Sequence, residues 1–72
     1  MRIDRQIKIL CAKSDITNSE IARRLGKTPQ AFQQKLKRGR LSVEDLNEIA
    51  LVTGCQFECK FVLLDGTTID LN

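Results

Sequence analysis

The sequence predicts a mainly α fold in which four to five short helices are followed by a C-terminal β-hairpin. Apolar residues recur every three or four positions up to about residue 54, and every second position from Cys55 onward. Three of the helical stretches also begin after a Ser or Thr and end at a Gly. The 72 residues have room for one domain, with a helical bundle to about residue 54 and the hairpin at about 55–72.

The first helix is predicted from a single apolar stripe. Its members are spaced by four, three and one positions, which places them on one side of a helix over about residues 2–13. The stripe consists of Ile3, Ile7, Leu10 and Cys11. Ile9 falls off this stripe, and nothing in the sequence pattern accounts for it.

The second and fourth helices begin with the same capping pattern. The Thr17 hydroxyl is expected to accept a hydrogen bond from the amide of Glu20, and the Glu20 carboxylate one from the amide of Thr17. Ser42 and Asp45 repeat this arrangement. The second helix is thus predicted over 18–25, ended by Gly26, because glycine adopts the left-handed conformation at little cost.

The third helix is predicted from its cap and its first residue. Thr28 is the cap, and Pro29 occupies the first helical position, where its missing amide hydrogen costs nothing. Phe32 and Leu36 supply the buried side, while amide and basic residues supply the exposed side. Gly39 ends the helix.

Alternation and pairing predict the hairpin register. A two-residue loop at Asp65-Gly66 would place Asp70 opposite Phe61, on the apolar face. A three-residue loop over 64–66, with Gly66 in the left-handed conformation, instead pairs Phe61 with Ile69 and Lys60 with Asp70. This second register keeps one face apolar and is the one we expect. We also expect the hairpin to pack back on the helices.

Composition excludes several classes of protein. The chain has no His, so it lacks an imidazole base and a Cys/His zinc site, and we expect no enzyme activity, metal, cofactor or small-molecule ligand. No apolar run approaches the roughly 20 residues that span a bilayer, so we expect no membrane partner. An odd number of Cys and a charged start favour the cytoplasm.

Charge is divided unevenly along the chain. Residues 1–40 carry 11 Lys and Arg against three acids, which gives +8, whereas residues 41–72 carry one Lys against six acids, which gives −5. A basic half of this kind is typical of a surface that meets a polyanion such as a nucleic acid.

The stretch TNSEIARRLGKTPQAFQQKLKRG joins two capped helices through a short turn. It resembles the helix-turn-helix of the Cro and lambda-repressor-like (XRE) family of transcription regulators. That family has a small residue where the two helices touch, a Gly at the turn and apolar residues at set positions. These positions are occupied here by Ala22, Gly26, Ile21, Leu25 and Phe32. The resemblance covers about residues 3–54, implies a lambda-repressor-like fold, and leaves the hairpin outside the common core.

The resemblance also implies which residues contact DNA. Its base-reading positions fall on Thr28, Pro29, Gln30, Gln33 and Gln34, and its phosphate contact at the start of the second helix falls on Asn18. A glutamine amide can donate to and accept from adenine at once, so Gln30 and Gln34 are the best readers, and Pro29 is left with apolar contact. Further phosphate contacts are expected from the flanking basic residues Lys27, Lys37, Arg38 and Arg40, with Arg2 and Arg5 as additional candidates.

These observations predict a regulator of transcription, of the Cro repressor type, that binds double-stranded DNA through the major groove. A short recognition helix reads few base pairs, so we expect a homodimer on half-sites about 34 Å apart. The C-terminal hairpin, with Val62 and Leu64 facing outward, is the expected dimer contact. The alternative is a protein-interaction module of the antitoxin or adaptor kind, in which the same fold and the hairpin bind a partner protein.

Overall fold

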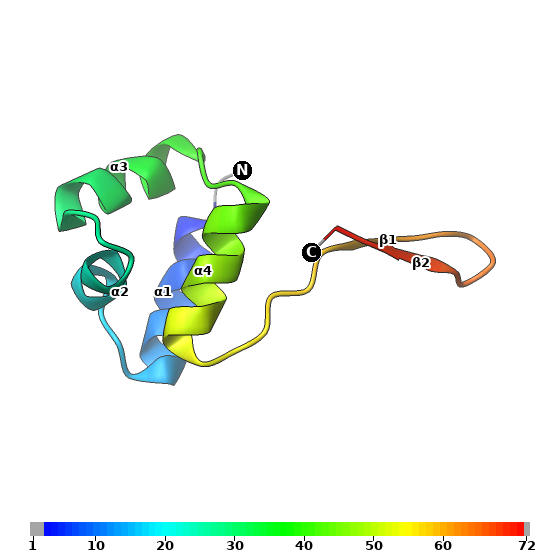
Figure 1. The fold of residues 1–72 in the computed structure, drawn as a ribbon, viewed down its shortest axis with the longest axis horizontal. Coiled ribbons are helices and arrows are strands. Elements are labelled where there is room, and N and C mark those ends of the chain that lie inside the picture. The colour runs from blue at the N-terminus through cyan, green and yellow to red at the C-terminus, as the bar shows by residue number, and fades with distance from the viewer. Residues whose placement is uncertain (1–2, 72) are drawn as a thin grey trace.

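The structure is a computed structural model that describes residues 3–71. It consists of four helices followed by a two-stranded antiparallel hairpin, which confirms the predicted fold class (Figure 1). The elements are α1 (Asp4–Ser14), α2 (Asn18–Arg24), α3 (Pro29–Arg38), α4 (Val43–Thr53), β1 (Lys60–Val62) and β2 (Thr68–Asp70). Residue 2, where the first helix was expected to begin, lies outside the described part of the chain.

The helices begin at the predicted caps. The hydroxyl of Thr28 accepts a hydrogen bond from the amide of Ala31 at 3.1 Å. Ser42 and Asp45 form the complete reciprocal capping box, with distances of 3.1 and 2.9 Å. Only half of the expected box forms at α2, because the Thr17 hydroxyl accepts from Glu20. The Glu20 carboxylate turns instead toward two arginines of its own helix.

Turns at glycine end three of the helices. At the end of α2, the amide of Lys27 donates to the Ala22 carbonyl at 2.8 Å and that of Gly26 to the Arg23 carbonyl at 3.0 Å. Gly26 has a φ of +73°, as this hydrogen-bonding pattern requires. The turn between α2 and α3 is therefore held by backbone hydrogen bonds, and it fixes the direction in which α3 leaves.

The core lies between the four helices. Its largest fully buried side chains are Phe32, Ile21, Leu36 and Ile49. Ile7 is the buried member of the predicted α1 stripe, and the other three pack half-buried against the core. Ile9, which falls off the stripe, is half exposed.

The hairpin has the predicted register. Phe61 pairs with Ile69, and Lys60 with Asp70. The amide of Gly66 donates to the Leu63 carbonyl at 3.0 Å, and Gly66 has a φ of +91°. The loop is therefore the expected three-residue loop with a left-handed glycine.

The hairpin does not pack back on the helices, contrary to our expectation. Figure 1 shows it projecting from the end of α4, away from the bundle. All six residues of β1 and β2 are exposed. The radius of gyration is 13.3 Å, and the molecule measures 43 × 24 × 20 Å. A compact chain of this length would have a radius of gyration of about 11 Å. We call residues 58–71 the arm.

Candidate nucleic-acid interface

The candidate interface is built on the contact between α2 and α3. Ala22 is fully buried there, which allows the two helix backbones to approach closely. Phe32 and Leu36 face inward from α3 and are each 1% exposed. Because these two residues face the core from one side of α3, the opposite side of the helix faces solvent.

The predicted base-reading residues lie on the outward side of α3. Thr28, Pro29, Gln30, Gln33 and Gln34 are all exposed. The glutamines occupy the first and middle turns of a helix that begins at Pro29. Three amide side chains are thus held on one rigid helix and turned away from the core, and each presents a donor and an acceptor together.

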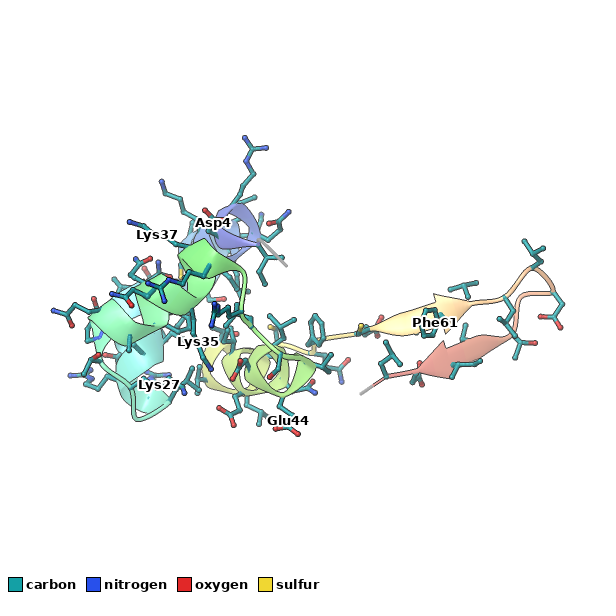
Figure 2. All side chains as sticks on the ribbon, turned by 90° about the horizontal axis from the view of Figure 1, so that it is seen from above. Asp4, Lys27, Lys35, Lys37, Glu44 and Phe61 are labelled. Carbon is teal, nitrogen blue, oxygen red and sulfur yellow. The ribbon has the colours of Figure 1, made fainter. Side chains whose placement is uncertain are left out.

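Basic residues flank this amide surface. Lys37 and Arg38 lie in the last turn of α3, and Arg40 follows it; all three are exposed. Lys27 is half-buried in the turn before α3. Figure 2 shows Lys27 and Lys37 near opposite ends of the helix. The predicted phosphate contacts therefore bracket the amides.

A groove between α1 and α3 brings together the candidate Arg5 and a basic residue, Lys8, that the sequence did not point to. It has a volume of about 420 Å³, and it is lined by Asp4, Arg5, Lys8, Asn18, Gln33 and Leu36. Asn18, at the first position of α2, thereby lies in one groove with Arg5 and Lys8. Nothing in the sequence singled out Lys8, although its spacing of three from Arg5 places both on one helix face.

Asn18 is held in place by α1. Its Oδ1 accepts a hydrogen bond from the Cys11 thiol at 3.1 Å. Burial raises the pKa of Cys11 above its ordinary value, which keeps the thiol protonated as a donor. The Asn18 side chain is therefore oriented at the edge of the groove.

Three other basic residues have structural partners. Glu20 binds both Arg23 and Arg24. Arg24 also donates to the carbonyl of Val52 at 3.0 Å, which joins α2 to the end of α4. The Lys35 ammonium lies 3.3 Å from the Asp45 carboxylate and joins α3 to the start of α4. These residues position the interface.

The Asp45 carboxylate is stabilised in its charged form. Burial alone would raise its pKa, but the hydrogen bond from the Ser42 amide and the interaction with Lys35 outweigh burial and lower the pKa below its ordinary value. Asp45 therefore remains ionised while it links the capping box of α4 to α3.

Glu44 and the acidic residues of the arm lie away from the exposed side of α3. Figure 2 shows Lys37 and Glu44 on opposite sides of the helical bundle. In Figure 1 the arm projects from the end of the molecule opposite α2 and α3. The amide and basic surface of α3 is therefore not covered by the acidic half of the chain.

The described residues contain neither a membrane-spanning helix nor a metal-binding cluster. No helix within residues 3–71 is both long and apolar enough to cross a bilayer. Across the same residues, His, Cys, Asp and Glu side chains do not gather in threes as a metal site would need.

Two short helices crossing over a glycine turn, with polar and basic side chains exposed on the second, define a helix-turn-helix DNA-binding domain. Residues 2–38 match the sequence model of the winged helix-turn-helix DNA-binding family, and the chain belongs to this family. The match spans the first three helices and ends before α4 and the arm. Comparisons with the curated proteins and with the solved structures found no match.

Proposed function

We propose that this chain is a sequence-specific regulator of transcription, of the Cro repressor type, that binds the major groove with α3. The observation that carries this proposal is the exposed amide row of Gln30, Gln33 and Gln34, bracketed by basic residues and free of any cover from the acidic arm. A surface of this kind combines base reading with phosphate binding on one rigid helix.

Each residue of the interface has a distinct role in this proposal. Gln30 and Gln34 are one helical turn apart, and each makes a bidentate contact with an adenine of a neighbouring base pair. Pro29 makes apolar contact with a thymine methyl, and Thr28 reads a base beside it, while its hydroxyl also caps the helix. Gln33 reaches both the bases and the groove near Asn18.

The phosphate contacts fix the protein on the duplex. Lys27 holds one strand before α3, and Lys37, Arg38 and Arg40 hold the backbone beyond its end. Asn18, with Arg5 and Lys8, binds a phosphate at the groove between α1 and α3. These contacts supply affinity and register without reading sequence.

A homodimer completes the proposal, because one short helix reads too few base pairs for useful specificity. The arm is the proposed contact between copies, with Val62 and Leu64 among its exposed apolar residues. The arm lies at the end of the molecule opposite α3, so it can join two copies while both recognition helices remain exposed.

The test is a titration of random duplex DNA at several salt concentrations. The logarithm of the binding constant should fall with the logarithm of salt, with a slope of about −0.9 for each phosphate contact. Lys37→Ala should make this slope shallower by about 0.9. Lys60→Ala is the matched control: it removes the same charge from the arm and should leave the slope unchanged.

Three outcomes would count against the proposal. A flat salt response of the wild type would refute DNA binding and support the alternative of a protein-interaction module, which the exposed apolar arm would also suit. An unchanged salt slope in Lys37→Ala would show that Lys37 contacts no phosphate. If Lys60→Ala makes the salt slope shallower by as much as Lys37→Ala does, the arm itself contacts DNA phosphates.

A further inference from the structure

The arm exposes a continuous apolar face. Phe61 and Ile69 form one cross-strand pair, and Leu63 and Leu71 lie on the same side of the hairpin by alternation. We call these four residues the arm face. Each is about half exposed, from 44% for Leu63 to 60% for Phe61. A two-stranded hairpin in water is marginally stable, so this face needs a cover.

The helical bundle contains an apolar cavity at the root of the arm. Its volume is about 320 Å³, and it is lined by Ile3, Gln6, Ile7, Leu10, Leu46, Ile49, Ala50, Cys55, Gln56 and Phe57. Phe57 also packs against the helical core, one residue before the arm begins. The cavity therefore lies next to the point where the arm leaves the bundle.

The tip of the arm carries an exposed residue with no structural role in its own copy. Leu64 is completely exposed in the loop between the strands, with a relative exposure of 109%. The tip is too far from the cavity of its own chain to fill it. Seven residue steps separate Phe57 from Leu64, which corresponds to about 23 Å of extended chain.

We propose that two copies pair their arms antiparallel, arm face against arm face, with Leu64 of each copy inserted into the cavity at the root of the other. The two arms are equal in length, so a two-fold axis through the middle of the arms brings each tip to the opposite root. This inference deepens the dimer proposed above and rests on it.

The area of the surface favours a second copy as the occupant. Four half-exposed large side chains leave on the order of 350 Å² of arm face per copy. Two arm faces would therefore bury roughly 700 Å², which is below the ~1,000 Å² expected of a specific interface. Two inserted tips with their cavities raise the total to on the order of 1,200 Å², the lower end of the usual range. The area buried by arm pairing alone is too small for a specific interface, and the area buried by tip insertion makes up the difference.

Charge and position argue against the arm as a DNA-binding wing. The arm carries Glu58, Asp65 and Asp70 against a single Lys60, so it would be repelled by phosphates. It also lies at the end of the molecule opposite α3, and it lies outside the residues that match the winged family.

The first test measures mass by sedimentation without DNA. The wild type should sediment as a dimer, and Leu64→Asp should raise the dissociation constant at least about 30-fold, as removal of a central apolar anchor does. Leu51→Asp is the matched control, because Leu51 is 79% exposed on α4 and does not line the cavity. Unchanged helical circular dichroism in both variants shows that the bundle remains folded.

The second test uses the native Cys55, which lines the cavity. In Leu64→Cys, mild oxidation should give a covalent dimer in which the new thiol at the tip is joined to Cys55 at the root of the other copy. Nine residue steps, about 30 Å of extended chain, prevent this bond within one copy, since a disulfide needs Cα atoms within about 7 Å. Adding Cys55→Ser should abolish this cross-link, and peptide mass mapping identifies it.

The outcomes separate the two levels of the proposal. A monomeric wild type refutes the dimer and the tip insertion together, whereas DNA binding by that monomer with the expected salt slope leaves the DNA proposal standing. A dimer that survives Leu64→Asp, or one that Leu51→Asp dissociates equally, refutes the tip insertion alone. A cross-link that persists in Cys55→Ser joins two tips or another cysteine and also refutes it.

Discussion

Replacing Asp45 by Ala should remove both the capping box of α4 and the ion pair that joins α3 to α4. The Asp45 carboxylate accepts from the Ser42 amide at 2.9 Å and from the Lys35 ammonium at 3.3 Å. Loss of a capping interaction costs about 1 kcal/mol. The ion pair adds about 0.2 to 1 kcal/mol, because the Lys35 side chain is more than a third exposed. We therefore expect a total loss of about 1 to 2 kcal/mol in the free energy of unfolding.

Urea unfolding followed by circular dichroism measures this loss, and Lys35→Ala is its control. Lys35→Ala removes only the ion pair, so it should cost less than about 1 kcal/mol. Asp45→Asn should fall between the two, since its amide oxygen can still accept from Ser42. If Lys35→Ala is as destabilising as Asp45→Ala, the ion pair and not the cap dominates, and the reasoning is wrong.

The same residue gives a prediction for pH. The pKa of Asp45 is lower in the folded protein than its ordinary value of 3.8, because the Ser42 amide and Lys35 stabilise the carboxylate more than burial destabilises it. The stabilisation is therefore complete above the unfolded pKa and is lost as pH falls through the lower folded pKa. The difference in stability between wild type and Asp45→Asn should be constant above about pH 5 and shrink below about pH 4. A difference that instead grows as the solution is acidified would contradict this sign.

Two further substitutions test the interface. Gln34→Ala should cost about 1 to 3 kcal/mol of binding free energy on the preferred site and little on random DNA, as measured by fluorescence anisotropy. Equal losses on both would show that Gln34 reads no base. Ala22→Leu should destabilise the fold by about 1 to 3 kcal/mol, because Ala22 is fully buried where α2 meets α3 and a larger side chain must separate them. Its DNA affinity should also fall under conditions where it remains folded, and an unchanged affinity would mean that α3 keeps its orientation.

Local signals in the sequence were sufficient for most element boundaries. The caps at Thr28 and Ser42 and the turn at Gly26 depend on residues within five positions of one another, so their hydrogen bonds follow from the sequence pattern. The hairpin register was also predictable, because only one loop length keeps Asp70 off the apolar face. The Glu20 carboxylate was the exception, since two arginines compete with the Thr17 amide for it.

Contacts between distant segments were not predictable in the same way. The groove that joins Lys8 to Gln33 exists only because α1 lies beside α3, and no periodicity within α1 encodes that neighbour. The link between Arg24 and the Val52 carbonyl spans 28 positions. The direction of the arm was predicted wrongly for a related reason: an apolar face requires a cover, but the sequence does not say whether the cover belongs to the same copy.

The division of charge along the chain follows from where each half must lie. The first three helices form the surface proposed to meet DNA, and their basic residues would displace the counterions condensed on the phosphates. The six acidic residues of the second half, 41–72, lie on α4 and on the arm, and their repulsion from phosphates would keep the arm off a bound duplex. In the proposed dimer, the second half-site contact would be an intramolecular event, so affinity for a paired site would rise by orders of magnitude without a longer α3. An arm of the opposite charge would compete with α3 for phosphates, so the acidic residues of the arm suit the proposed contact between copies.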